Sequence, residues 1–147
     1  MSGQQPVVIG WKERVRFVDW GVRGVRVKVD TGARTSALGA DYYVLADDPT
    51  LGRVAEMRVT FDRKHPDRQT HLRAPVLGFV VVANSGGMKE QRPVIETRIR
   101  LGAVTKVVQF TVANRSQMRF PVILGRRAIA CDFLIDVSRA FTQRKRK

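Results

Sequence analysis

The stretch VKVDTGARTSALGA, residues 27–40, decides the fold of this chain. Val25, Val27 and Val29 alternate with charged residues, and this period of two is typical of a half-buried β-strand. Asp30 follows the strand directly, Gly32 permits a tight turn, and the small Ala33 lets another backbone segment come close. Such a turn occurs both as a plain strand end and as the seat of a reactive carboxylate.

Outward from this stretch, most of the chain has the pattern of strands and turns. Residues 54–61 and 76–83 are β-rich, and residues 94–101 and 107–112 are predicted to form a hairpin across a short Gly-containing connection. The polar segment 62–73 contains a proline and is predicted to be a loop. The segment 126–131 is expected to form the one short helix, so the sequence predicts an all-β fold with that helix near the C-terminus.

The composition favours one basic domain. The 147 residues include 27 Lys and Arg against 13 Asp and Glu, a net charge of +14, and the last four residues are RKRK. We expect one folded domain over residues 1–143 and a basic disordered tail over 144–147, which would contact RNA without sequence specificity. The charge on the folded body predicts an acidic partner or substrate.

The same sequence predicts a cytoplasmic protein with no membrane contact. Its single cysteine, Cys131, excludes an intramolecular disulfide and fits a reducing compartment. No signal peptide is evident at the start, and the longest apolar run, residues 74–83, is too short to span a bilayer.

No cofactor and no metal are predicted. The two histidines, His65 and His71, lie in the polar segment without a further ligand at a recognisable spacing. The sequence contains no G-x-x-x-x-G-K-[ST] loop that would hold the phosphates of a nucleotide.

A second motif, FPVILGR at residues 120–126, follows far downstream of the D-T-G-A segment. The combination of D-T-G-A with a later apolar-apolar-Gly-Arg segment resembles the retropepsin-like aspartic proteases. RPVIETRIRLG (92–102) and RSQMRFPVILGRRAIACDFLIDVSRAF (115–141) narrow the resemblance to the RimB-like bacterial group often labelled "ATP-dependent zinc protease". That group is encoded beside RimK-type glutamate ligases, and the resemblance covers most of residues 11–141.

The resemblance implies a retropepsin-like, barrel-like β fold that is active as a two-fold dimer. Aspartic proteases need two carboxylates that share one proton, and D-T-G occurs once in this sequence. Asp30, Thr31 and Gly32 are therefore the expected catalytic motif, with Asp30 supplied by each of two subunits and Thr31 tying the two loops. Ala33, Ile123, Leu124, Gly125 and Arg126 are expected to support the loop and the dimer.

A flap is expected at the turn Asn84, Ser85, Gly86 and Gly87, which would close over the substrate. Substrate contacts are expected from cations that replace the apolar or acidic residues of viral relatives. Lys28 lies two residues before Asp30, on the same face of the strand, and Arg34 lies two residues after Gly32. Further candidates are Arg53, Arg92, Arg115 and Arg127.

Such cations would pair with substrate carboxylates. Since RimK-type ligases add glutamates to a small-subunit ribosomal protein, the resemblance implies a peptidase that removes oligoglutamate tails from that protein. Gly39 stands where most members of the group have His, which would alter specificity. Two alternatives stay open at this point: an inactive module of the same fold that binds the ribosome or RNA, and a general endopeptidase.

Overall fold

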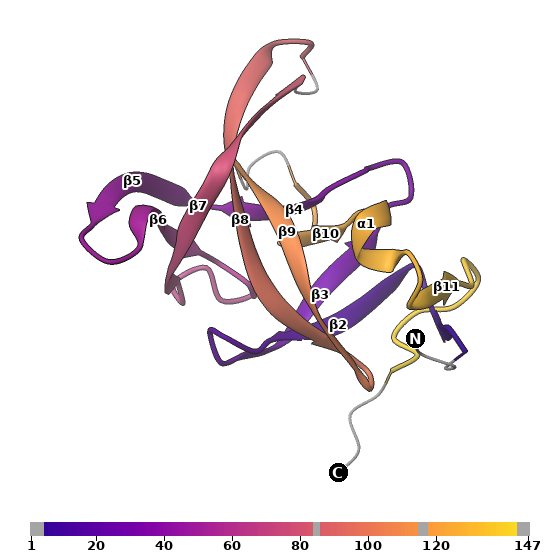
Figure 1. Cartoon of the computed structure of the whole chain (residues 1–147). Coiled ribbons are helices and arrows are strands. Elements are labelled where there is room, and N and C mark those ends of the chain that lie inside the picture. The colour runs from indigo at the N-terminus through magenta and orange to yellow at the C-terminus, as the bar shows by residue number, and fades with distance from the viewer. Residues whose placement is uncertain (1–4, 84–85, 115–117, 144–147) are drawn as a thin grey trace.

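The structure is a computed structural model that describes residues 5–83, 86–114 and 118–143. The strands are β1 (Val7–Ile9), β2 (Lys12–Phe17), β3 (Val22–Val29), β4 (Ser36–Ala40), β5 (Tyr42–Asp48), β6 (Gly52–Val59), β7 (Thr70–Ala83), β8 (Lys89–Leu101), β9 (Val104–Asn114), β10 (Val122–Leu124) and β11 (Phe133–Ile135). A short helix, α1 (Arg126–Ile129), precedes β11. The mainly β fold expected from the sequence is confirmed (Figure 1).

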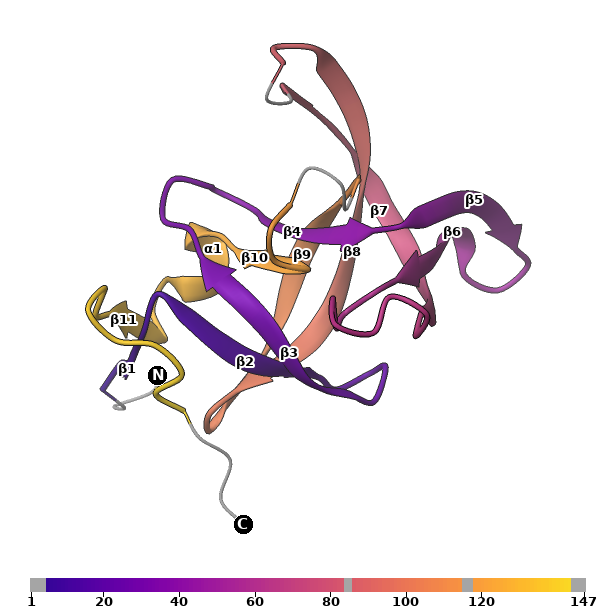
Figure 2. The same cartoon turned by 180° about the vertical axis from the view of Figure 1, so that it is seen from behind.

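The sheet closes on itself to form a six-stranded barrel. Its strands run in the order β2-β3-β10-β4-β9-β8, and β8 pairs back with β2 to complete the circle. β7, β6 and β5 continue the sheet beyond β8 as an antiparallel arm. The β5–β6 hairpin extends from the opposite side of the barrel to α1, and the long β7–β8 hairpin projects away from it (Figures 1 and 2). The retropepsin-like barrel implied by the motifs is thus the fold of this chain.

The core follows from the alternation along the strands. Val25, Val27 and Val29 of β3 point inward and are buried, while the residues between them are exposed. Inside the barrel the Phe17 ring lies 5.7 Å from the Phe110 ring and 5.0 Å from the Trp20 ring, centroid to centroid. Burial of each large apolar side chain contributes about 1.5–3 kcal/mol, so this interior holds the barrel rigid.

The structure corrects several boundaries, among them those of the polar loop and of the helix. Strand β7 begins at Thr70, so the expected loop 62–73 is wrong over its last four residues. Pairing with β6 explains the difference, because the β6 backbone, with Val59 opposite Thr70, supplies hydrogen-bond partners that local sequence does not reveal. The helix spans Arg126–Ile129, two residues shorter than expected at its C-terminal end, and Cys131 has a positive φ of 74°.

A second, two-stranded parallel sheet of β1 and β11 lies beside the barrel. Val8 and Leu134 are register partners in it, so strands from the two ends of the chain meet here. The expected β8–β9 hairpin is also confirmed, with Leu101 opposite Val104. Within the described residues, no helix has the length and apolar character needed to cross a membrane.

Candidate active site

The D-T-G segment lies at the end of β3, in the connection from β3 to β4. Strand β10 is inserted between these two strands, parallel to β3 and antiparallel to β4. Leu124 is the register partner of Val29, and the Asp30 N–H donates a hydrogen bond to the Leu124 carbonyl over 2.9 Å. The topology therefore brings the two distant motifs of the sequence into direct contact.

The loop is folded tightly around Asp30. The Gly32 N–H donates to Asp30 Oδ1 over 2.9 Å, and the Ala33 N–H donates to the Asp30 carbonyl over 3.2 Å. Asp30 is half-buried, whereas Thr31 and Gly32 are exposed. One carboxylate is thus fixed in orientation at the edge of the barrel, with the turn of its motif facing outward.

Arg126, the first residue of α1, braces this loop. Its N–H donates to the Ala33 carbonyl over 2.8 Å, and its guanidinium Nη1 donates to the Thr31 carbonyl over 2.9 Å. The next residue, Arg127, donates its N–H to the Arg34 carbonyl over 3.1 Å. Backbone and side chain of the helix start therefore hold both sides of the D-T-G turn.

Gly125 is required by the closeness of this contact. A Cβ at this position would lie 2.8 Å from the Ala33 carbonyl oxygen and 2.8 Å from the Thr35 carbonyl oxygen. The Gly125 N–H donates to the buried Ser36 Oγ over 3.0 Å. Only a residue without a side chain fits here, which explains the glycine of the second motif physically.

Lys28 and Arg34 lie on either side of the D-T-G turn and are both exposed. Lys28 stands on the outer face of β3 because its neighbours Val27 and Val29 fill the core. None of the ion pairs among the described residues involves Lys28 or Arg34. Both cations are therefore available to an anionic ligand near Asp30.

Two other expected substrate residues already have acidic partners. Arg53 lies at the start of β6, in the β5–β6 hairpin that Figure 1 shows on the far side of the barrel from α1, and its Nε lies 3.8 Å from Asp47 Oδ1. Arg92 on β8 donates from Nε to Glu90 Oε1 over 2.8 Å, and its side chain is 14% exposed. The structure does not bring Arg53 to Asp30, and Arg115 lies outside the described residues.

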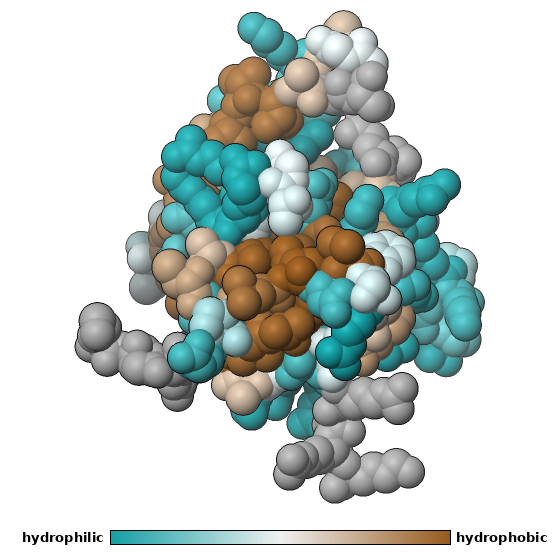
Figure 3. Space-filling model, turned by 90° about the vertical axis from the view of Figure 1, so that its right-hand side faces the viewer, coloured by the Kyte–Doolittle hydropathy of each residue, from teal (hydrophilic) through white to brown (hydrophobic). Residues whose placement is uncertain are grey.

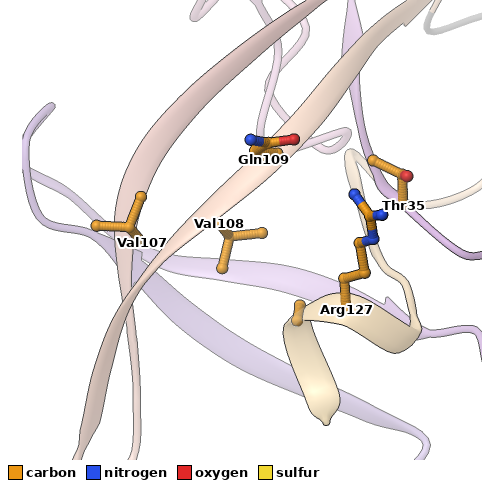
Figure 4. A pocket seen from close by; sticks show the side chains of 6 residues that line it. Thr35, Val107, Val108, Gln109 and Arg127 are labelled. Carbon is orange, nitrogen blue, oxygen red and sulfur yellow. The ribbon is translucent and has the colours of Figure 1, made fainter. Parts of the chain in front are cut away.

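Arg127 lines a cavity of about 230 Å³ between β9, α1 and the segment before β4. Figure 4 shows its side chain extending from the helix toward Thr35, with Val107, Val108 and Gln109 of β9 on the other side. This cavity adjoins the segment that follows Arg34, so Arg127 lies beside the loop without being part of the turn.

The expected flap falls on the tip of the β7–β8 hairpin. Gly86 and Gly87 are exposed there, and Gly87 has a φ of +81°, while Asn84 and Ser85 lie outside the described residues.

Gly39, which stands where most members of the group have His, is buried on β4, and its N–H donates to the Pro121 carbonyl over 2.8 Å. The position that departs from its group therefore sits beside β10 in the barrel wall.

Outside the D-T-G loop, the ionisable groups of the described residues bear on two questions, a metal site and shifted pKa values. In the parts of the chain that the structure describes, no group of three or more His, Cys, Asp or Glu side chains could hold a metal ion. Hydrogen bonds from the Leu51 and Thr50 N–H groups lower the pKa of Asp48, which lies at the β5–β6 turn. Hydrogen bonds from the Ser138 hydroxyl and N–H lower the pKa of Asp136, which follows β11.

Sequence analysis missed one set of residues near the site. Lys12, Arg14 and Arg16 of β2 share the outer face of the barrel, and the alternation in KERVRF was the signal that could have identified them. The buried residue between the first two, Glu13, also went unnoticed, although it anchors the C-terminal segment.

A closed six-stranded barrel with a D-T-G loop gripped by an inserted strand and a short helix defines the retropepsin-like class of proteins. The family model described as "Retropepsin-like aspartic endopeptidase RimB" matches residues 8–146. The chain belongs to this RimB-like family.

Relatives that match this chain are named as glutamate ligases and not as peptidases. The chain is 34% identical over 134 residues to a "Probable alpha-L-glutamate ligase" of Desulfotalea psychrophila, covering 88% of this chain and 28% of that protein. A "Probable alpha-L-glutamate ligase" of Shewanella pealeana is 33% identical over 139 residues, which cover 91% of this chain and 29% of the relative. The chain thus spans less than a third of the length of these relatives.

A solved structure supports the fold. The crystal structure of a protein of unknown function from Legionella pneumophila matches with a TM-score of 0.76 and 22% identity. The match covers 95% of this chain and 100% of the other chain.

Proposed function

We propose that this chain is a peptidase that hydrolyses acidic peptides, and that its substrates are oligoglutamate tails added by a RimK-type ligase to a small-subunit ribosomal protein. The observation that carries the proposal is the position of Asp30 on a tightly held loop between Lys28 and Arg34, two cations without an ion-pair partner among the described residues. A carboxylate catalyst surrounded by positive charge suits a substrate made of carboxylates.

The proposed catalyst is a homodimer. An aspartic protease uses one carboxylate as a base toward water and a second as an acid toward the scissile carbonyl, and this chain contributes one D-T-G. A two-fold axis beside the exposed Thr31 and Gly32 would bring Asp30 against the partner's Asp30. The two carboxyl groups would share one proton because like charges at short range cannot both ionise.

The surface around β1 and β11 suits the dimer contact. Val8 and Leu134 are side by side in that sheet and are 43% and 57% exposed. Figure 3 looks at the side of the molecule that carries α1 and β11, and apolar side chains gather in the middle of it. The β1–β2 corner contacts the residue directly before the motif, since the Val29 N–H donates to the Trp11 carbonyl over 2.8 Å. A contact here would therefore be transmitted to the D-T-G loop.

In this dimer one Asp30 removes a proton from water while the other protonates the scissile carbonyl oxygen. The hydroxide attacks the carbonyl carbon to give a tetrahedral diol. As the diol collapses, the C–N bond breaks, the first Asp30 gives the proton that it took from water to the leaving amine, and the other Asp30 takes back a proton from a diol hydroxyl. Lys28 and Arg34 pair with the substrate carboxylates nearest the scissile bond. The name of the ligases that contain a region similar to this chain supports glutamate as the amino acid concerned.

A substrate panel tests the proposal directly. Oligoglutamate, the same peptide with glutamine for glutamate, a mixed peptide library and a short RNA are presented to the wild type and to Asp30→Asn, with Asp67→Asn as the matched control. Asp67 is exposed in the 62–69 segment and is no part of the loop. We expect hydrolysis of oligoglutamate by the wild type and the control, and loss of about three orders of magnitude or more in Asp30→Asn, because an amide takes no proton from water.

ATP and chelators are expected to leave the rate unchanged, because none of the proposed steps uses them. Equal cleavage of the glutamine peptide would replace the proposal by a general endopeptidase. Binding of RNA without any peptide cleavage would replace it by an RNA-binding module. Hydrolysis that survives Asp30→Asn would assign the chemistry to another group.

A further inference from the structure

Six cations form a continuous strip on the outer face of the barrel, starting beside the D-T-G loop. We call this the cationic strip, and its members are Lys12, Arg14 and Arg16 of β2, Arg26 and Lys28 of β3, and Arg100 of β8. The β2 cations share one face because the residues that alternate with them, Glu13, Val15 and Phe17, are buried. The strip therefore crosses three adjacent strands of the barrel wall.

The register of these strands sets like charges directly opposite one another. The cross-strand partners are Lys12 with Lys28, Arg14 with Arg26, and Arg16 with Arg100. Like charges in such positions destabilise a sheet, since their β-carbons lie about 5 Å apart. Three consecutive pairs of this kind are a local conflict with folding, and conflicts of that sort are typical of functional surfaces.

In the described part of the chain, no ion pair with an acidic side chain offsets this repulsion. None of the ion pairs formed by the described residues includes a member of the cationic strip. Arg16 Nε is buried and meets no hydrogen-bond partner in the described part of the chain. An anionic ligand along the strip would supply the missing negative charge.

Phe141 organises three of these cations. Its ring centroid lies 4.3 Å from Arg14 Cζ, 5.2 Å from Lys12 Nζ and 5.4 Å from Arg26 Cζ, and its N–H donates to the Lys12 carbonyl over 2.9 Å. Cation–π contacts of this kind fix the direction of long side chains. The ring is engaged by the protein's own cations, so it offers no open platform on which a base could stack.

We propose that the cationic strip is a docking track for an extended acidic peptide, which continues from the scissile bond at Asp30 across β3 and β2. This inference rests on the proposed function and adds the path of the substrate tail. Lys28 begins the track two residues before Asp30. An extended peptide repeats its side-chain direction about every 6.6–6.8 Å, which matches the spacing of alternate residues along β2.

The length of the track sets a measurable limit. From Lys12 to Arg16 the strand rises by about 13 Å, which accommodates roughly four to five residues of an extended chain. Affinity for oligoglutamate should therefore increase with each residue up to about that length beyond the cleft and then level off. A peptide bound only at the cleft would show no such dependence.

The experiment measures binding separately from hydrolysis. Fluorescein-labelled oligoglutamates of two to ten residues are titrated by fluorescence anisotropy against Asp30→Asn protein, with and without Arg14→Gln plus Arg26→Gln. The matched control carries Lys64→Gln plus Arg68→Gln, which removes the same charge from the exposed 62–69 segment. We expect the strip variant to bind long tails roughly tenfold more weakly at low salt and to lose the length dependence, while the control keeps it.

Thermal unfolding of the same variants excludes a structural explanation. Removal of opposed cations should leave the melting temperature of the strip variant unchanged or higher, while its affinity falls. An identical length dependence in the strip variant and the control would overturn the proposal. The proposal would also be overturned if an RNA of equal charge bound more tightly than oligoglutamate and if that binding depended on Arg14 and Arg26. If the wild type hydrolyses no acidic peptide although peptide binding depends on the cationic strip, the proposed peptidase function is wrong, whereas the docking track is supported.

Discussion

Asp30 owes its setting to a small number of individual contacts. Its N–H is tied to Leu124, its carboxylate accepts from Gly32, and Arg126 holds the next carbonyl of the loop, that of Thr31. Each contact is a single hydrogen bond worth about 0.5–1.5 kcal/mol, yet together they leave the loop little freedom. Preorganisation of this kind matters for catalysis because small misplacements of a reacting group are costly in rate.

Replacement of Lys28 is the first prediction at this scale. Lys28→Met keeps the volume and removes a charge that no acidic side chain of the described residues pairs with. We expect kcat/KM for oligoglutamate to fall by about tenfold or more, because a charge-assisted contact is worth about 1.5–3 kcal/mol. Steady-state kinetics over a salt series measures it, and Lys64→Met in the exposed 62–69 segment is the control. Equal rates for the two variants would remove Lys28 from the binding site.

Gly125 gives a second prediction. Gly125→Ala forces a Cβ to within 2.8 Å of backbone atoms of Ala33 and Thr35, which cannot move without shifting the D-T-G loop. We expect a loss of about 1–3 kcal/mol in the free energy of unfolding, measured by urea denaturation, together with a fall in kcat. The control is Gly78→Ala on β7, where nothing lies within 4 Å of the added methyl group. If both variants unfold at the same urea concentration, the close approach at Gly125 does not limit stability.

At the scale of elements, the site depends on segments from both ends of the chain. β10 enters between β3 and β4, while the segment after β11 returns across β2 and brings Phe141 to the cationic strip. Glu13 is fully buried and holds that segment, accepting hydrogen bonds from the Thr142 hydroxyl over 2.6 Å and the Gly10 N–H over 2.7 Å. The carboxylate also accepts from the N–H groups of Thr142 and Gln143.

Glu13→Gln should therefore release the C-terminal segment. The NH₂ group of the glutamine would lie against the N–H and O–H donors that now bond to the Glu13 carboxylate, and it cannot accept from them. Loss of a charged acceptor costs about 1.5–3 kcal/mol. We expect faster tryptic cleavage after Arg139 and a matching drop in the urea midpoint. Glu96→Gln, on the exposed face of β8, serves as the control. Unchanged cleavage kinetics in Glu13→Gln would mean that other contacts fix the segment.

The whole molecule is strongly basic, and its proposed active form is made of two copies. The net charge of +14 doubles on dimerisation, so the long-range field at the shared cleft attracts an acidic tail and weakens as salt rises. The apolar sheet of β1 and β11 offers the surface on which two basic chains could associate despite this repulsion.

Assembly yields the last prediction. Sedimentation velocity of the wild type should give a species of about twice 16.6 kDa at concentrations where peptide hydrolysis is observed. Leu134→Lys should shift the equilibrium to monomer and abolish hydrolysis, since a desolvated charge at the contact has no partner. The control is Leu51→Lys, at an exposed leucine between β5 and β6, which should leave the dimer intact. An active wild type that sediments strictly as a monomer would exclude a shared pair of Asp30 side chains.

The sequence by itself determined the mainly β class, the D-T-G turn and the placement of Lys28 on the same strand face as Asp30, because strand alternation and turn chemistry are local. Tertiary structure decided which distant segments meet: Gly125 against Ala33, Glu13 against Thr142, and Arg16 opposite Arg100. It also paired Arg53 and Arg92 with acidic neighbours and extended β7 back to Thr70 through its register with β6. These outcomes depend on strand register and barrel closure, which are set by packing between residues far apart in the chain and leave no local pattern.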